Sequence, residues 1–275
     1  MRGLVLTLGI LLIVGGGSQT VPPATPPPAQ HTNAPTDTIG SAPNSHIMPP
    51  APKFHYPLGQ NYVFAVEWHM FTAGIASVKM ESAGAQNKVT AIANSQGFVN
   101  SLFGVHDHFE ALFDPHTFCS VRITKHTEEG SHKRDTDIHF DYPRLKSVLD
   151  EKNLKTGETK HTENDVPSCV TDVVTGFFYL ASLPLAPGDS YTFPLNDGGK
   201  TADVLARVDG FEQIKGPTGT YQTIRVSCEA VNGPLKEKGK VWAWFTNDAN
   251  RTPVQMRAKM TWGTLLFRLQ SVERH

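Results

Sequence analysis

The chain has 275 residues, of which 25 are Lys or Arg and 26 are Asp or Glu, so its formal net charge is −1. This even balance creates no field that would attract nucleic acid or an anionic membrane, and we expect no nucleic-acid partner. The length suits one large domain or two small ones, but the first fifth of the chain is too rich in proline to contribute to a core.

Residues 1–18 have the composition of a secretory signal peptide. Arg2 supplies a positive start, residues 4–14 form an apolar run, and three glycines and a serine follow. The apolar run is too short to span a bilayer comfortably. We therefore expect an exported protein of the periplasm or cell envelope, with no transmembrane segment beyond this signal. An uncleaved N-terminal anchor is the alternative.

Residues 19–53 form a proline-rich segment that contains no Phe, Tyr or Trp and few large aliphatic side chains. Such a composition cannot bury enough apolar surface to offset the entropy lost on ordering. We expect a disordered, extended linker that connects the signal peptide to a single domain at residues 54–275.

Alternation of apolar and polar residues with a period of two dominates the chain from Tyr56 onward, as in half-buried strands. In the first run, Tyr62, Phe64, Val66, Trp68 and Met70 share one face. Further runs lie at residues 73–81, 88–94, 105–113, 119–127, 136–141, 145–154, 190–195, 202–208, 220–231, 240–246, 254–262 and 265–271, and a Thr-Gly turn at 156–157 suggests one more return strand. Because one face of most strands is polar, the sheet should be antiparallel.

One segment breaks this pattern. Between Asp165 and Leu183, apolar residues recur at spacings of three and four, which predicts a helix of about three turns that begins with a cap at Asp165 or Ser168. The expected fold is therefore all-β dominated: a curved antiparallel sheet or open barrel of about 10–14 strands with one helix packed on it.

Three cysteines, Cys119, Cys169 and Cys228, lie far apart in the sequence and form no CxxC pair. An oxidising compartment would allow at most one internal disulfide among them. The spacing does not determine which pair would close, and three buried free thiols remain the alternative.

The order of several short motifs resembles a bacterial family known as domain of unknown function 3108, whose members are similar to exported envelope proteins. The resemblance rests on Ala73-Gly74-Ile75-Ala76, Val105-His106-Asp107, the helix running into Pro187-Gly188, the segment 216–221, and the segment 241–248 followed by Arg251 and Pro253. It covers about residues 54 to 273 and implies a fold and an exported location, but no activity.

His106, His108 and Glu110 alternate along one predicted strand and would share a face. Two imidazoles and a carboxylate are an adequate set of ligands for zinc, with one position left open for catalysis. A solvated strand face explains the same residues without a metal.

The aromatic residues suggest a different kind of site. Six of them could line a concave sheet roofed by the helix and bind an apolar small molecule or lipid: Trp68, Phe177, Phe178, Trp242, Trp244 and Trp262. The alternative is that these side chains only fill a closed core.

No nucleophile motif, metalloprotease motif or phosphate-binding glycine loop occurs in the sequence. We therefore expect a non-catalytic exported protein without a cofactor, which binds an apolar or lipid-like ligand through its curved sheet. Two alternatives remain: a protein–protein interaction module with a closed core that meets an envelope partner at a strand edge, and a metal-dependent enzyme centred on His106, His108 and Glu110.

Overall fold

The structure is a computed structural model that describes residues 45–69, 71–197, 200–233, 236–237, 239–261 and 263–274. The predicted signal peptide and residues 19–44 of the predicted linker lie outside the described residues.

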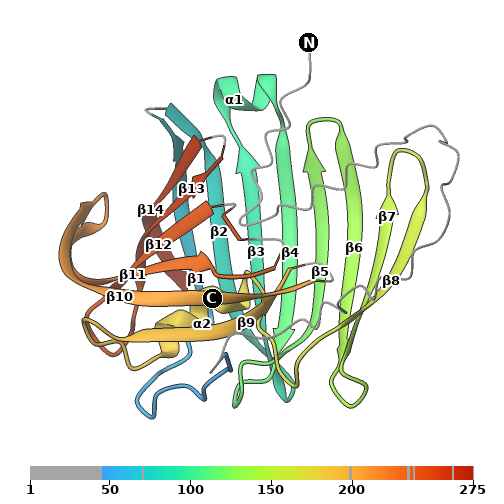
Figure 1. Cartoon of the computed structure of the whole chain (residues 1–275). Helices are drawn as coiled ribbons and strands as arrows, with labels where there is room; N and C mark the ends of the chain where they lie inside the picture. The colour runs from blue at the N-terminus through green and yellow to red at the C-terminus, as the bar shows by residue number, and fades with distance from the viewer. Residues whose placement is uncertain are drawn as a thin grey trace, which may run out of the picture.

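The described part of the chain forms one antiparallel sheet of 14 strands and two helices (Figure 1). The strands are β1 (Gln60–Trp68), β2 (Phe71–Ala83), β3 (Gln86–Ser95), β4 (Val105–Phe113), β5 (Ser120–Glu129), β6 (His132–Asp141), β7 (Lys146–Asn153), β8 (Thr159–Asp165), β9 (Ser190–Asn196), β10 (Thr201–Gly216), β11 (Gly219–Ala230), β12 (Gly239–Thr246), β13 (Pro253–Met260) and β14 (Gly263–Arg274). The helices are α1 (Gly97–Leu102) and α2 (Thr175–Ser182). The prediction of an antiparallel all-β fold is confirmed, with two helices in place of one.

The strand order is β8-β7-β6-β5-β4-β3-β2-β1-β14-β13-β12-β11-β10-β9. Each strand therefore pairs with its neighbours in sequence, except that β14 returns to pair with β1 and α2 separates β8 from β9. Strands β8 and β9 are the two edges, and the sheet does not close into a barrel.

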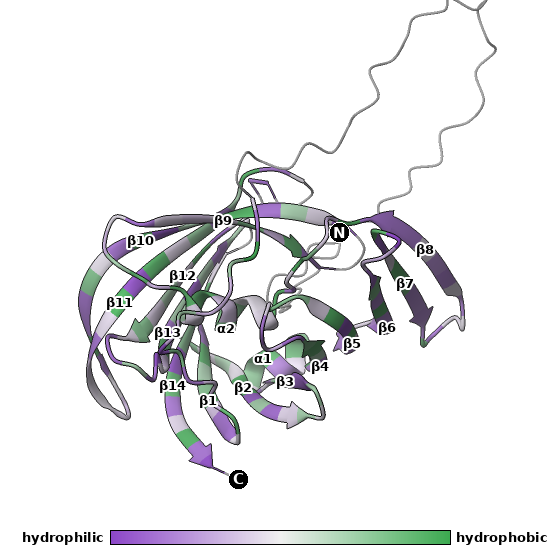
Figure 2. Cartoon of the chain, turned by 90° about the horizontal axis from the view of Figure 1, so that it is seen from below, coloured by the Kyte–Doolittle hydropathy of each residue, from purple (hydrophilic) through white to green (hydrophobic). Residues whose placement is uncertain are grey.

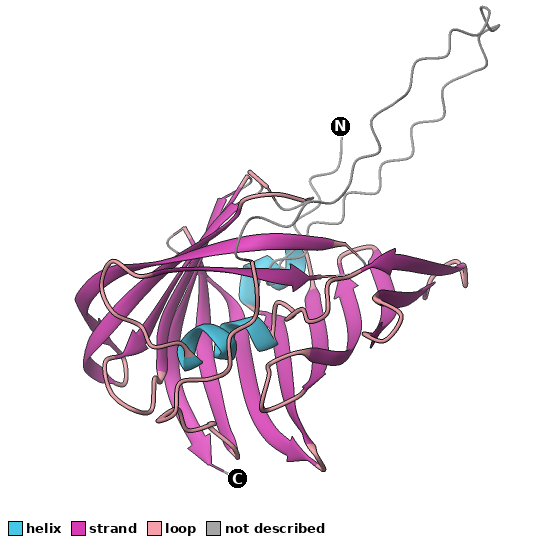
Figure 3. Ribbon diagram, turned by 60° about the horizontal axis from the view of Figure 1, so that its bottom comes forward, coloured by secondary structure: helices cyan, strands magenta, loops and turns pink. Residues whose placement is uncertain are grey.

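The sheet curls into a trough, because the right-handed twist of the strands accumulates across so many neighbours. In Figure 1, β9 and β10 cross the direction of β3–β5, and in Figure 3 α2 lies in the space between the two arms of the sheet. Figure 2, which views the chain from below, shows β10–β14 and β1–β4 as an arc around α2.

Strand β4 illustrates how the sequence sets the two faces of the sheet. Val105, Phe109 and Ala111 are almost completely buried on the concave side, whereas His106 and His108 are exposed on the convex side. The same alternation recurs along most of the strands. The buried apolar side chains therefore gather on the concave side of the sheet and form the core there.

The predicted helix is present but shorter than expected, and its predicted start is wrong. Asp165 ends β8, and α2 has only eight residues, Thr175–Ser182. Before it, the backbone N–H of Thr171 donates to Pro194 O at 3.1 Å, and Thr171 O accepts from Asn196 N–H at 2.9 Å. These bonds hold Thr171 against β9, and Val173 and Val174 form a turn, so the helix begins only at Thr175.

Residues that precede position 54 also pack against the domain. Met48 N–H donates to the Tyr179 hydroxyl at 3.0 Å, and Ala51 N–H donates to Ser182 O at 2.9 Å. Met48 also contacts the core. Residues 45–53, which the sequence assigns to the linker, therefore lie against the folded domain in the structure.

Neither α1 nor α2 is long and apolar enough to cross a bilayer, and the described residues contain no other helix.

Candidate ligand-binding cavity

An apolar cavity of about 110 Å³ lies on the concave side of the sheet, beneath α2. Its wall is built by side chains from α2 and the residues before it, and from β1–β3 and β9–β14. Small residues make the space: Ala76, Ala91 and Ala243 occupy wall positions where a larger side chain would fill it.

Part of the wall keeps apolar surface unburied. Six apolar lining residues are only half-buried: Val78, Phe177, Ala230, Val241, Met256 and Met260. Polar atoms contribute little to the wall: its ionisable groups are the carboxylate of Glu229, which is paired with Arg207 at 2.6 Å, and the thiol of Cys228. Burial raises the pKa of this thiol to about 12, so it stays protonated and neutral. The cavity therefore suits a hydrocarbon group better than a charged one.

A network of hydrogen bonds holds the start of α2, which roofs the cavity. Asp172 accepts from the backbone N–H groups of Val174 and Thr175 at 2.8 and 2.9 Å and so caps the helix. Its other oxygen accepts from the Ser120 hydroxyl at 2.6 Å, which ties the cap to the start of β5. All four residues are buried.

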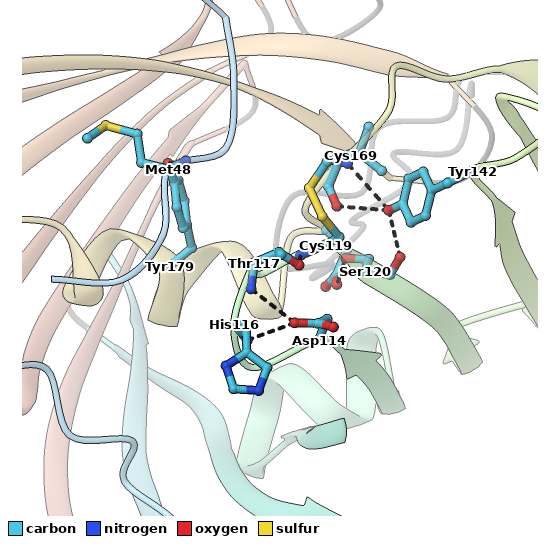
Figure 4. Close-up of a disulfide and its surroundings, with 11 residues drawn as sticks. Met48, Asp114, His116, Thr117, Cys119, Ser120, Tyr142, Cys169 and Tyr179 are labelled. Carbon is cyan, nitrogen blue, oxygen red and sulfur yellow. Dashed lines mark hydrogen bonds between the residues drawn. A yellow bond between two sulfur atoms is a disulfide. The ribbon is translucent and has the colours of Figure 1, made fainter. Parts of the chain in front are cut away.

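A disulfide reinforces the same junction (Figure 4). Cys119 and Cys169 are bonded at 2.02 Å and connect the β4–β5 loop to the segment that leads into α2. Beside the disulfide, the Tyr142 hydroxyl donates to Ser120 O at 2.7 Å and accepts from Val170 N–H at 3.4 Å. The pairing that the sequence left open is thus Cys119 with Cys169, and Cys228 is free.

Of the five predicted aromatic residues that the structure describes, only Phe177 reaches the cavity wall. Phe177 lines the cavity, with its ring centroid 5.4 Å from that of Phe245. Phe178 is buried on another side of α2, where its ring lies 6.3 Å from Tyr62. Trp68 lies at the end of β1, with its indole against the backbone of Gly263.

Trp242 and Trp244 lie on the convex face of β12, opposite the cavity. Their neighbours Val241 and Ala243 line the cavity, so alternation directs the two indoles outward. Trp244 is nevertheless 3% exposed, because its Nε1 donates to Glu212 at 2.9 Å and Arg257 lies 5.9 Å from its ring. The sixth predicted residue, Trp262, lies outside the described residues.

Sequence reasoning missed the aliphatic part of the wall. Val241 on β12 and Met256 and Met260 on β13 line the cavity, within the alternating runs 240–246 and 254–262. The sequence pattern could not indicate that these side chains line a cavity instead of packing against other side chains.

His106, His108 and Glu110 all lie on β4 and face the convex side, as the alternation predicts. His106 Nδ1 is hydrogen-bonded to Asn94 at 3.0 Å, and His108 Nε2 is 3.7 Å from the Glu110 carboxylate. Within the described ranges, no group of three or more His, Cys, Asp or Glu side chains is placed to hold a metal ion.

A second hollow, of about 540 Å³, lies on the polar convex face of β4–β8. Its histidines are paired with carboxylates: His126 Nδ1 lies 2.6 Å from Asp135, and His161 Nδ1 lies 2.7 Å from Asp150. These pairs are about half exposed, as expected for a solvated strand face, so the hollow offers no free set of ligands.

Among solved structures, the chain is similar to the "Beta-barrel-like Protein of Domain of Unknown Function DUF1849" from Brucella abortus, with a TM-score of 0.56. The match has 9% sequence identity and covers 84% of this chain and 99% of that one. At such low identity, the likeness concerns the fold alone.

Two further matches have lower TM-scores. A "putative exported protein with YmcC-like fold" from Bacteroides fragilis matches with a TM-score of 0.32, 8% identity and coverage of 80% of this chain and 98% of that one. A "putative lipoprotein" from Parabacteroides distasonis matches with a TM-score of 0.31, 10% identity and coverage of 84% and 100%.

No curated protein matches the chain. A family model does match, over residues 63–270, which include nearly the whole sheet and α2. The chain therefore belongs to the family described as protein of unknown function DUF3108.

Proposed function

We propose that this chain is an exported protein of the periplasm or cell envelope that binds an apolar, lipid-like molecule beneath α2 and catalyses no reaction. The observation that carries the proposal is the cavity itself, whose wall leaves apolar side chains such as Val241 and Met256 half-buried. Concave apolar surface with few polar groups is the usual character of a small-molecule site.

The size of the cavity limits how much of a ligand it encloses. Drug-sized molecules occupy pockets of about 300–1,000 Å³, whereas an engineered apolar cavity of about 150 Å³ stays dry and binds benzene. A space of about 110 Å³ encloses a small alkyl group, and the rest of the ligand would lie along the half-buried side chains. Met256 and Met260 can adjust their flexible side chains to such a ligand.

The disulfide supports the exported location, together with the signal-like sequence at residues 1–18. Disulfides form and persist in the periplasm, on cell surfaces and in secreted proteins, and they are rare in the reducing cytosol. Cys119 and Cys169 are both only partly buried, so cytosolic reductants would have access to the bond.

Binding of a small ligand is better supported than the alternative function, that of a protein–protein interaction module. Such a module would pair a partner with a free strand edge, and β8 is an edge of the sheet. Lys160, His161 and Glu163 are polar or charged residues on this short edge strand, and such residues oppose edge-to-edge pairing.

Native mass spectrometry of the protein purified without denaturation from the periplasm of an expression host tests the proposal. We expect a bound apolar molecule that is released on unfolding. The cavity-filling variant Val241→Trp should lose it, whereas the matched variant Trp242→Phe, on the convex face of the same strand, should retain it. A bare mass for the wild type, or equal occupancy in Val241→Trp, would contradict the proposal.

A further inference from the structure

We infer that one edge of the sheet docks on the surface of a lipid bilayer, with the exposed apolar side chains of α1 and of the start of β2 inserted into it. This is the edge at which β1 ends, β2 begins and α1 connects β3 to β4. The inference goes beyond the proposed function and rests on it in one respect, because the bilayer would be the source of the apolar molecule that the cavity takes.

The most exposed large apolar side chains of the described residues lie at this edge. Phe98 and Leu102 of α1 are 76% and 69% exposed, and Phe71 at the start of β2 is 68% exposed. Phe98 and Leu102 are four residues apart, so they share one face of the helix. We call these three residues the apolar tip. Large apolar side chains that are exposed together mark a surface that contacts a partner or a membrane.

Hydrogen bonds fix α1 beside the start of β2, so the exposure of the apolar tip belongs to the folded domain. The backbone N–H of Gln96, directly before α1, donates to Ala73 O at 2.8 Å. The Ser95 hydroxyl donates to Asn100 Oδ1 at 2.7 Å and accepts from Val105 N–H at 2.8 Å. These bonds tie the helix to the ends of β3 and β4, and Figure 1 shows α1 at the upper edge of the sheet.

The cavity opens along the same edge. Trp68, where β1 ends, pairs with Phe71, where β2 begins, and the end of β1 also pairs with the start of β14. There Gly263 pairs with Met260, which in turn pairs with Gly239 at the start of β12. Gly239 and Met260 line the cavity, and Gly239 is exposed.

The apolar tip and this opening are separated by four strand-to-strand steps, from β2 to β12, or about 20 Å. A bilayer that receives the tip can therefore also cover the opening. An apolar ligand would then pass between lipid and cavity without exposing its hydrocarbon surface to water.

The chemistry of the edge favours lipid over a protein partner. Residues 68–78 and 89–106, which contain the apolar tip, carry no Asp, Glu, Lys or Arg, although these four types make up 19% of the chain. A charged side chain is costly to transfer into hydrocarbon, whereas protein partners are usually met by a polar, charged rim. Ile75 and Ile92, on the convex face of β2 and β3, extend the exposed apolar surface within the same two segments.

Vesicle flotation tests the inference. The protein purified from the periplasm of an expression host is mixed with phosphatidylcholine vesicles, which carry no net charge, at low and at high salt. We expect the protein to float with the vesicles and to partition equally at both salt concentrations, because salt screens interactions between charges and not apolar contacts. A partition that falls at high salt would contradict apolar docking.

The variant Phe71→Ser/Phe98→Ser should lower the partition coefficient at least tenfold, since burial of even one Phe side chain favours the bound state by about that factor. The matched variant Leu145→Ser/Phe211→Ser also removes two exposed apolar side chains and should bind as the wild type does. Leu145 lies between β6 and β7 at the opposite edge of the sheet, and Phe211 lies in the outer half of β10. Urea unfolding checks that both variants remain folded.

Equal flotation of Phe71→Ser/Phe98→Ser and the wild type, or a wild type that does not float, would overturn the inference. A wild type that forms dimers in sedimentation velocity, which this variant loses, would also overturn it, because the apolar tip would then join two copies of the chain.

The cavity-filling variant Val241→Trp separates the inference from the proposed function, because it should still float with vesicles. A wild type that floats but carries no apolar molecule in native mass spectrometry would overturn the proposed function and leave the docking surface. A wild type that carries the molecule but does not float would overturn the docking surface alone.

Discussion

Lys125 and Asp197 form a buried ion pair that joins the two arms of the trough, with Lys125 Nζ 2.7 Å from Asp197 Oδ1. Their side chains are 4% and 6% exposed. Lys125 lies on β5, and Asp197 directly follows β9 at the other end of the strand order. Lys125 also lies 5.9 Å from the ring centroid of Phe109. The pair is thus a contact across the concave side that no strand pairing provides.

Removal of one partner of this pair should strongly destabilise the protein. Lys125→Met leaves the Asp197 carboxylate buried without its counter-charge, and the loss of one partner of a buried pair costs about 3–5 kcal/mol. Replacement of both partners, as in Lys125→Met/Asp197→Leu, should recover most of this loss. Urea unfolding followed by fluorescence measures both free energies.

An exposed ion pair serves as the control. Arg207 and Glu229 are 2.6 Å apart but 51% and 38% exposed, and Arg207→Met should cost less than about 1 kcal/mol. If Lys125→Met costs no more than Arg207→Met, the buried pair does not hold the arms together.

Asp107 and Glu129 should make the protein less stable as the pH rises. Burial raises the pKa of Asp107 to about 7, and burial together with the neighbouring Asp107 raises the pKa of Glu129 to about 8. The folded protein therefore retains protons that the unfolded chain releases near pH 4, so stability falls between about pH 4 and pH 8.

The variant Asp107→Asn/Glu129→Gln removes these titrations and should flatten the profile. Since each unit of pKa shift corresponds to about 1.4 kcal/mol and both pKa values are raised by about three units, we expect a gain of several kcal/mol at pH 8 relative to wild type, and little gain at pH 4. Thermal unfolding across this range checks the sign. A wild-type stability that rises with pH, with the double variant parallel to it, would contradict the prediction.

Loss of the disulfide should destabilise the protein and loosen the roof of the cavity. The bond closes a loop with a sequence separation of 50 residues, for which chain entropy predicts a stabilisation of about 4 kcal/mol. The Cys119→Ser/Cys169→Ser variant should therefore unfold at lower urea, and its Cys228 should react faster with dithiodipyridine under native conditions. Unchanged reactivity would show that α2 is held without the disulfide.

Asp172 should be required for the start of α2. Asp172→Ala removes the cap from Val174 and Thr175 and leaves the buried Ser120 hydroxyl without its partner, which should cost about 2–3 kcal/mol. Asp172→Asn retains an acceptor oxygen for the helix and should lose clearly less. Equal losses for the two variants would argue against a capping role.

Much of the fold could be predicted from the sequence, because strand alternation is a local property. The run 105–113 becomes β4 with its predicted faces, and the run 254–262 corresponds to β13, Pro253–Met260. The Thr-Gly turn at 156–157 does precede a return strand, β8. A period of two appears wherever one face packs and the other is solvated, so each strand carries its own signal.

The sequence was less informative where tertiary contacts compete with local pattern. Residues 170–174 have helical spacing, yet backbone bonds tie Val170 to β5 and Thr171 to β9, so α2 begins only after the turn that Asp172 caps. The sequence also placed Trp242 and Trp244 on one face of a strand, correctly, but both faces of β12 are apolar, so alternation could not tell which one meets the cavity.

The sequence by itself thus determined the all-β class, a range of about 10–14 strands with their approximate bounds, and which side chains share a face, since these follow from interactions between neighbours in the chain. Only the tertiary structure decided that Cys119 pairs with Cys169, that Lys125 meets Asp197, and that a space remains beneath Phe177. Each of these depends on how far the sheet twists and curls. That curvature is the sum of small contributions from 14 strands, and no single segment encodes it.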